Sequence, residues 1–163
     1  ALSAKILGAE TVVLTDLYDY KLEIAKTVGI DDVRSARRED LTQTLLEAYP
    51  GKFETVLLAS GAPPVMEQAM ALVQRGGRIV VTALFLEPTP VDLLQITLQE
   101  LQVVGSQIYT AEDFEAALQW LDDGRWSFEE IISHVYPLDQ APAVFQNIAE
   151  HPENAIKVLL TAS

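Results

Sequence analysis

The chain has 163 residues, of which 49% are hydrophobic, and its net charge at pH 7 is −13. This length and composition suit a folded domain with a buried core. The acidic charge argues against a nucleic-acid partner and against an anionic membrane surface. The absence of cysteine excludes disulfides and thiolate metal ligands, and no apolar run reaches the roughly 20 residues of a membrane span. Since no signal peptide is visible, we expect a cytoplasmic protein.

The first 29 residues have the pattern of the second half of a dinucleotide-binding βαβ unit. A helix tail over residues 1–8 leads into an apolar strand over 11–15, which ends at the acidic Asp16. An acid at the tip of the second strand of such a unit hydrogen-bonds the adenosine ribose. The glycine-rich turn that binds the pyrophosphate is expected about 20 residues earlier, outside the chain. We therefore expect a piece of a larger protein that begins inside its first cofactor-binding helix.

Helix and strand patterns alternate through the remaining sequence, which indicates an α/β fold with a parallel sheet. One predicted helix follows Asp16 and ends at Gly29, and others lie over residues 41–49, 63–73, 91–99 and 141–150. A further helix begins at residues 110–113 and stops at Gly124. Predicted strands lie over residues 32–34, 55–59, 79–83, 101–108, 131–136 and 156–161.

Several local signals set the predicted bounds and faces of these elements. In the helix after Asp16, the predicted apolar face comprises Tyr20, Ile24, Ala25 and Val28. The continuously apolar strand 55–59 is typical of a strand covered on both faces. Prolines 63 and 64 suit a first helical turn. The glycines at 76 and 77 are expected to separate a helix from a strand, and residues 110–113 resemble a capping box.

A series of short motifs runs through the chain in a fixed order. It comprises Ala4 and Lys5, Gly8 and Ala9, VVLTD at 12–16, Lys21, Ala25 and Lys26, Gly29, GGRIV at 76–80, VGS at 104–106, HVYPL at 134–138 and IKV at 156–158. Their order and spacing resemble those of the medium-chain, zinc-dependent alcohol and polyol dehydrogenases over essentially the whole chain.

The resemblance implies a doubly wound parallel sheet of the Rossmann type, truncated at its N-terminus. Residues 1–108 would be an incomplete dinucleotide-binding domain, and residues 109–163 would return to the catalytic domain. The zinc ligands, the proton relay and the substrate pocket of that family would lie in an N-terminal part outside this chain. The two histidines have no plausible zinc-ligand spacing, and His134 is interpreted as structural.

Asp16 is the first candidate for cofactor binding. Its carboxylate would accept hydrogen bonds from ribose hydroxyls and repel a 2′-phosphate, and Leu17 and Tyr18 supply no cation, so we expect NAD rather than NADP. Lys21 lies one helical turn further on and could also reach the ribose. A helix-capping acid and an exposed lysine are the structural alternatives for these two residues.

The resemblance implies further cofactor contacts where the predicted strands end. Backbone groups of Thr82, Ala83 and Leu84 would hold the nicotinamide carboxamide, and Ser106 and Gln107 would face the nicotinamide ring. Ser60 and Gly61 would lie beside the dinucleotide, and Lys157 would be a cation near the pyrophosphate. Leu58 departs from the family pattern, which often has an acid there. Ordinary strand ends and a surface lysine are the alternatives.

The leading hypothesis is the NAD-binding portion of a zinc-dependent alcohol or polyol dehydrogenase, in which hydride passes from a secondary alcohol to NAD. The isolated chain is expected to be inactive. Two alternatives remain open: a non-catalytic nucleotide-binding or assembly module, and a zinc-free quinone reductase relative.

Two expectations concern the sheet. The resemblance implies that strand 101–108 lies at the sheet edge and pairs with a twin in a homo-oligomer, and Val103, Val104 and Ile108 would make that edge apolar. In the strand order 3-2-1-4-5-6 the absent first strand is central. A gap is therefore expected between strands 11–15 and 55–59.

Overall fold

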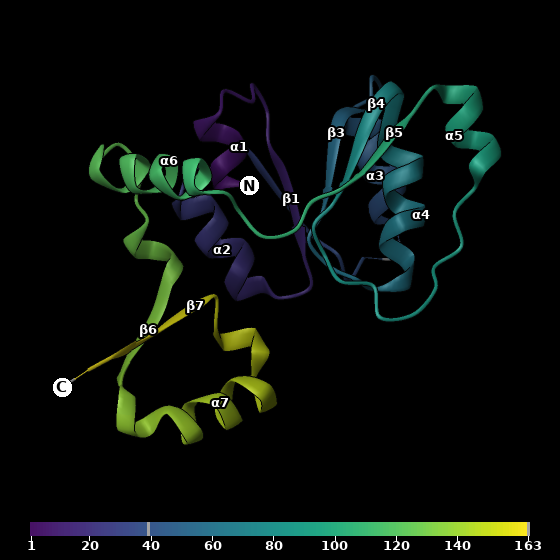
Figure 1. Ribbon diagram of the computed structural model, residues 1–163. Helices are drawn as coiled ribbons and strands as arrows, with labels where there is room; N and C mark the ends of the chain where they lie inside the picture. Colours follow the sequence, from purple (N-terminus) through teal and green to yellow (C-terminus); the bar gives the residue numbers. More distant parts are fainter. Residues whose placement is uncertain (39, 163) are drawn as a thin grey trace. The chain divides into compact units, whose positions relative to one another are not determined.

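A computed structural model describes residues 1–38 and 40–162, with helices and strands alternating along the chain (Figure 1). It divides into two compact units. The first unit contains the described residues of Ala1–Glu39 and Thr110–Ser163, and the second contains those of Asp40–Tyr109. All strand pairings among the described residues are parallel, so the predicted α/β class is confirmed.

The N-terminal half of the first unit is a parallel strand pair with its connecting helix. Its elements are α1 (Leu2–Ile6), β1 (Val13–Asp16), α2 (Asp19–Thr27) and β2 (Asp32–Ser35). Gly29 follows α2 with φ +83° and donates its N–H to the Lys26 carbonyl, as expected of a glycine after a helix end. The predicted apolar face of α2 is partly wrong, because Leu22 is buried beside Ala25 whereas Tyr20 is exposed.

The C-terminal half of the first unit contains a second parallel strand pair, β6 and β7. The helix α7 connects the two strands along the chain and lies to one side of them (Figure 1). Its elements are α6 (Ala111–Asp122), η1 (Glu129–Ile131), β6 (Ile132–Pro137), η2 (Leu138–Gln140), α7 (Ala141–Glu150), η3 (Pro152–Asn154) and β7 (Lys157–Thr161). The predicted capping box is confirmed, since the Thr110 side chain accepts from the Asp113 N–H and the Asp113 carboxylate accepts from the Thr110 N–H.

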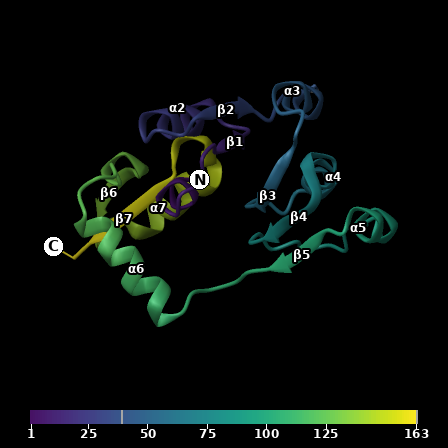
Figure 2. The same cartoon turned by 90° about the horizontal axis from the view of Figure 1, so that it is seen from above.

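The second unit is a three-stranded sheet in the order β3-β4-β5. Its elements are α3 (Leu41–Ala48), β3 (Phe53–Leu58), α4 (Pro63–Leu72), β4 (Val73–Val81), α5 (Leu93–Gln99) and β5 (Gln102–Gly105). Figure 2 shows α4 and α5 on the same side of the three strands. A buried cluster joins them, comprising Leu58, Met66, Ala69, Met70, Val73, Ile79 and Leu101. The expectation that β3 is covered on both faces is not met within this chain, since Leu57 is 51% exposed.

Strand β4 begins earlier than predicted. Val73 was expected in the helix, but it pairs with Phe53, and the next pairing joins Arg78 to Thr55. The extra residues between them form a bulge in which Gly76 has φ +73°. A Cβ on Gly77 would lie 2.7 Å from Val73 Cγ2 and 2.8 Å from the Gln74 carbonyl oxygen. The glycine pair thus lies inside the strand, where it permits the bulge, and does not separate helix from strand.

The division of the sheet agrees with the predicted gap. Among the described residues, β1 pairs with β2, and β3 pairs with β4, with no pairing between β1 and β3. The orders β2-β1 and β3-β4-β5 correspond to strands 3-2 and 4-5-6 of a doubly wound sheet. The predicted strand 101–108 is too long, because β5 ends at Gly105 and Ile108 has φ +64°. No helix among the described residues is long and apolar enough to cross a membrane.

Candidate cofactor site

Asp16 is the last residue of β1 and orders the turn into α2. Its Oδ1 accepts a hydrogen bond of 2.9 Å from the Tyr18 N–H, and its carbonyl accepts one of 2.8 Å from the Ala36 N–H. A carboxylate that bonds the amide two residues ahead closes an Asx turn. Among the described residues the Asp16 carboxylate accepts no other hydrogen bond, so its Oδ2 remains available to a ligand.

Two cations lie at the same strand tip as Asp16. The Lys21 Nζ lies 4.8 Å from the centroid of the Tyr18 ring, and the Arg37 Cζ lies 5.9 Å from it. The Arg37 Nε donates to the Leu17 carbonyl oxygen at 2.6 Å. We refer to Tyr18, Lys21 and Arg37 as the Tyr18 cluster.

Arg37 is a residue that the sequence interpretation missed. The predicted preference for NAD rests on the two residues directly after Asp16, whereas Arg37 lies 21 positions further along the chain. The parallel pairing of Asp16 with Ser35 brings it back, because the carboxyl ends of adjacent parallel strands share one edge of a sheet. Its position three residues after the next predicted strand, 32–34, was the available signal.

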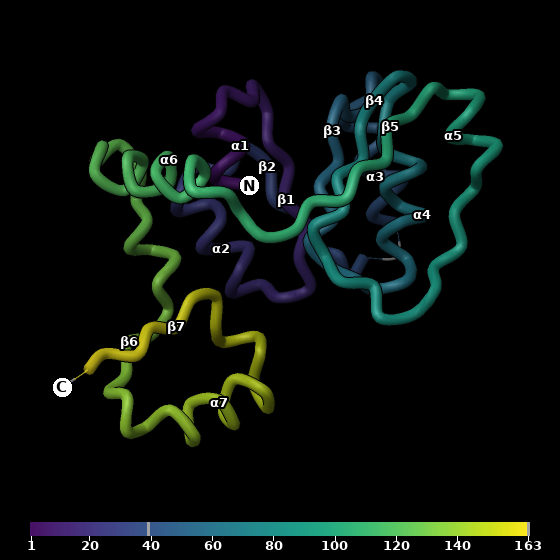
Figure 3. The backbone as a smooth tube through the Cα atoms, in the orientation of Figure 1, coloured from purple at the N-terminus to yellow at the C-terminus, as the bar shows by residue number. Residues whose placement is uncertain are grey.

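In the second unit, the predicted nicotinamide contacts surround one cavity. The cavity has a volume of about 390 Å³ and lies at the carboxyl ends of β4 and β5. Its lining residues are Val81, Thr82, Ala83, Leu84, Gly105, Ser106 and Gln107. The structure thus brings together five of the predicted site residues, and the backbone from residue 82 onward continues as a long connection to α5 (Figure 3).

Backbone hydrogen bonds fix the rim of this cavity. The N–H groups of Thr82 and Ala83 both donate to the Leu58 carbonyl oxygen, at 3.1 and 3.0 Å, and the Thr82 hydroxyl donates to it at 2.8 Å. The Ser106 N–H donates to the Val81 carbonyl oxygen at 2.9 Å. These three amides are therefore engaged within the protein and are not free donors for a ligand.

Ser60 and Gly61 lie two and three residues after the end of β3 at Leu58. A Cβ on Gly61 would lie 2.3 Å from the Leu84 carbonyl oxygen and 3.0 Å from its carbonyl carbon. The segment after β3 and the segment after β4 therefore approach each other so closely that only glycine fits at position 61. The Ser60 hydroxyl accepts from the Ala62 N–H at 3.4 Å, which makes it part of the turn into α4.

Lys157 lies on a different sheet from Asp16. It is the exposed first residue of β7, and its carbonyl oxygen accepts from the Ser133 hydroxyl at 3.0 Å. Both residues belong to the first unit, but the strand pairings place Asp16 in the β1–β2 pair and Lys157 in the β6–β7 pair.

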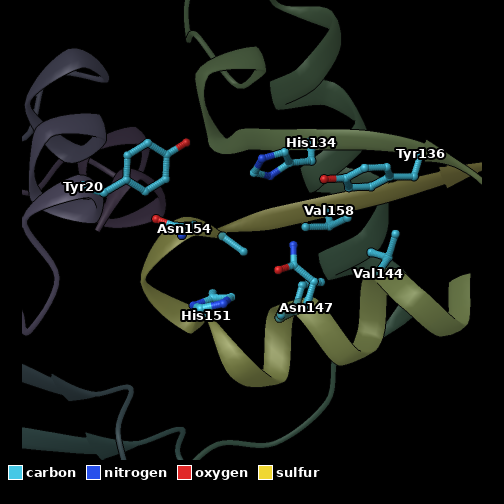
Figure 4. Close-up of a pocket in the computed structure, with 10 residues that line it drawn as sticks. Tyr20, His134, Tyr136, Val144, Asn147, His151, Asn154 and Val158 are labelled. Atoms are coloured by element: carbon cyan, nitrogen blue, oxygen red, sulfur yellow. The ribbon is translucent and has the colours of Figure 1, made fainter. Parts of the chain in front are cut away.

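A second cavity lies within the first unit, between β6, β7 and α7 and beside Tyr20 (Figure 4). Its volume is about 350 Å³. The rings of His134 and Tyr136 stack at 5.7 Å on its wall, and His151 Nδ1 lies 3.4 Å from a Glu153 carboxylate oxygen. The described residues contain no group of three or more histidine or acidic side chains placed to hold a metal.

The chain matches a known protein family over most of its length. Residues 1–123 match the family model described as zinc-binding dehydrogenase. An alcohol dehydrogenase of Geobacillus stearothermophilus is 32% identical over 156 residues, covering 96% of this chain and 45% of that protein. A sorbitol dehydrogenase of Halalkalibacterium halodurans is 31% identical over 157 residues, covering 93% of this chain and 45% of that protein. The chain therefore spans about half the length of the curated relatives it matches.

A solved structure supports the same assignment. The crystal structure of a putative zinc-binding dehydrogenase from Sinorhizobium meliloti, bound to NADP, superposes with a TM-score of 0.88 at 26% identity. The match covers 98% of this chain and 47% of that one. The predicted Rossmann-type architecture and the predicted family are confirmed, and the chain belongs to the zinc-binding dehydrogenases.

Proposed function

We propose that this chain is the cofactor-binding part of an NAD-dependent alcohol or polyol dehydrogenase. The observation that carries the proposal is the placement of Asp16 at the carboxyl end of β1, with one carboxylate oxygen in the turn and the other available. Such an acid, at the edge where dinucleotides bind an α/β sheet, suits the ribose hydroxyls of NAD. The names of the relatives support an alcohol or a polyol as the substrate class.

Each unit would supply some of the cofactor contacts. Asp16 and Lys21 would hold the adenosine ribose, Ser60 and Gly61 would lie beside the dinucleotide, and the cavity at the ends of β4 and β5 would take the nicotinamide. The carbonyl oxygens of Thr82, Ala83 and Leu84 would accept from the carboxamide, Ser106 and Gln107 would face the ring, and Lys157 would offset the charge of the pyrophosphate. When bound, NAD supplies the hydride acceptor.

The metal and the substrate would be held by residues beyond this chain. The described residues contain no group of three potential metal ligands. We extend the proposal to the division of the chain into a dinucleotide-binding part (1–108) and a segment returning to the catalytic domain (109–163), and to a cytoplasmic location. The two alternatives, a non-catalytic binding module and a zinc-free quinone reductase, gain no support from the relatives.

We also propose that β5 mediates homo-oligomerisation. It is the edge strand of β3-β4-β5, and Val103 and Val104 are 40% and 44% exposed. An apolar edge with unpaired backbone groups is a template for pairing with a second copy.

Two measurements test the cofactor proposal. NADH titrations followed by fluorescence should give saturable binding by the whole polypeptide in which this sequence occurs. The same polypeptide, with zinc, should reduce NAD in the presence of a secondary alcohol or a polyol. The isolated 163-residue chain should show no turnover, because the proposal places the residues for metal and substrate outside it. Turnover by the isolated chain, or a whole polypeptide that binds no NADH, would contradict the proposal.

A further inference from the structure

The cavity of the first unit lies between a face of the β6–β7 pair and a face of α7. On β6, His134 and Tyr136 are two positions apart and so share one face of the strand, with their rings stacked at 5.7 Å. Val158 of β7 pairs with His134 and continues this wall. Asn147 lies on α7, and Figure 4 shows its amide directed from the helix toward the strands. Both walls of the cavity therefore carry polar side chains.

The helical wall follows from the spacing of residues along α7. Val144, Asn147 and His151 are three and four positions apart, so they lie on one face of the helix. Val144 is buried, which anchors that face in the unit, whereas Asn147 and His151 are exposed. The helix thus gives the cavity an apolar base and polar groups that a solute can reach.

Five lining side chains have hydrogen-bonding groups that make no hydrogen bond with the described residues, 1–38 and 40–162. They are Tyr20, His134, Tyr136, Asn147 and Asn154. A phenol, a neutral imidazole and an amide can each donate and accept a hydrogen bond. Because these side chains come from α2, β6, α7 and η3, they meet the cavity from several sides. This arrangement suits a ligand with several hydroxyls better than a flat ligand whose polar edge lies in one plane.

The lining of the cavity carries no fixed charge. Among its described residues there is no lysine, arginine, aspartate or glutamate. His151 Nδ1 lies 3.4 Å from a Glu153 carboxylate oxygen, so a proton on that imidazole is balanced locally. A phosphate or carboxylate removed from water would need a cation here, and an ammonium group would need an acid. The ligand that fits this lining is therefore neutral.

We propose that this cavity binds a neutral monosaccharide in its ring form, through residues other than those proposed for the cofactor. Its volume of about 350 Å³ lies at the lower end of the range for small-molecule sites, which suits a single sugar ring. The hydroxyls would meet Asn147 and Tyr136, and the apolar face of the ring would pack on Val144 and Val158. A ring suits the site better than an open-chain polyol, because its hydroxyls are held in place before binding and less entropy is lost.

The test uses NMR titrations of the whole polypeptide in which this sequence occurs, with D-glucose, D-galactose and D-mannose as probes. D-Glucitol and adenosine serve as the open-chain and the flat comparison ligands. The variants are Asn147→Ala, Tyr136→Phe, which removes only a hydroxyl and keeps the ring beside His134, and Gln146→Ala. Gln146 is the matched control, since it lies on α7 outside the cavity lining and donates to Glu150 at 2.9 Å. Melting temperatures of all variants would reveal any loss of folding, in which case Tyr136→Phe decides.

At least one of the three sugars should bind the wild type with a dissociation constant of about 1 mM or tighter, as expected of a ligand of about a dozen heavy atoms. Asn147→Ala should weaken this binding about tenfold, the effect of one or two hydrogen bonds, and Tyr136→Phe about threefold. Gln146→Ala should leave it unchanged. Any D-glucitol binding that depends on Asn147 should be at least about tenfold weaker than that of the best sugar.

Three results would overturn the inference. The first is that none of the three sugars binds the wild type, and the second is that sugar binding is the same in the wild type and both cavity variants. The third is that D-glucitol or adenosine binds as tightly as the best sugar and loses affinity in Asn147→Ala, which would assign the cavity to another class of ligand. Because the readout is sugar binding, the result does not depend on whether the polypeptide binds NADH.

Discussion

Gly61 and Leu84 lie against each other through their backbones. A Cβ at position 61 would lie 2.3 Å from the Leu84 carbonyl oxygen, so the side-chain hydrogen of glycine is what allows the two segments to meet. Leu84 also lines the cavity at the ends of β4 and β5. The position of the cavity rim thus depends on the absence of a side chain 23 residues earlier.

Gly61→Ala should displace the segment at Leu84 and weaken NADH binding. Because the atoms in the way are backbone, the cost should resemble that of overpacking a core, about 1–3 kcal/mol. Gly51→Ala is the control, since a Cβ there meets nothing within 4 Å. Thermal melts and NADH titrations of both variants would measure the effect. Equal behaviour of the two variants would show that the close approach does not govern the cavity.

Asp16→Ala should weaken NADH binding and reduce the discrimination against NADPH. A charged hydrogen bond to the ribose contributes about 1.5–3 kcal/mol, so the dissociation constant should rise by roughly 10- to 100-fold. Asp16→Asn separates the two roles of the side chain, because it retains an oxygen for the Tyr18 N–H and removes the charge. Asp19→Ala, an exposed acid on α2, is the control. Unchanged NADH binding in Asp16→Ala would exclude a ribose contact.

Local signals account for much of the fold that the sequence predicted. Proline 63 begins α4, Thr110 and Asp113 cap α6, and Gly29 ends the turn after α2, since each acts on its own neighbours. Such signals need no knowledge of tertiary structure. The alternation of helix and strand patterns predicted the α/β class in the same way, whereas the order of the strands in the sheet followed from the family resemblance.

Features that depend on distant pairing were missed. The start of β4 at Val73 depends on its pairing with Phe53, and the position of Arg37 depends on the register between β1 and β2. The exposure of Leu57 depends on which faces of the sheet have helices in this chain. For the candidate site, the sequence showed which residue types lie at the strand ends. The charge balance around Asp16, in contrast, depends on the parallel register of β1 and β2.

The ion pair between Lys5 and Asp31 should make the stability of the first unit depend on acid pH. Lys5 Nζ donates to the Asp31 carboxylate at 2.8 and 2.9 Å, and the Val12 N–H donates to it at 2.7 Å. The hydrogen bond from Lys5, followed by that from Val12, lowers the pKa of Asp31 below its ordinary value of 3.8. The carboxylate therefore adds stability above pH 3.8, and this contribution is lost as the pH falls through the lowered pKa.

Asp31→Asn should remove this part of the acid dependence, and Lys5→Ala should reduce it, because it removes the main cause of the lowered pKa. Lys26→Ala, which breaks an exposed pair on α2, serves as the control. Urea unfolding followed by circular dichroism between pH 2 and 6 would measure the curves. Identical pH dependence in the wild type and Asp31→Asn would contradict the assignment.

The β5 edge should pair with a second copy, and a charge on it should oppose that pairing. Val104 lies in β5 opposite Val80 of β4 and is 44% exposed. In a two-fold symmetric pair, Val104→Lys would place two like charges near each other, which should weaken the dimer about tenfold or more. Val135→Lys is the control, because Val135 is a still more exposed valine in β6. Sedimentation velocity at micromolar concentration should show a dimer for the wild type and Val135→Lys, and monomer for Val104→Lys. A monomeric wild type would exclude the interface. A dimer that is insensitive to Val104→Lys would place the interface elsewhere.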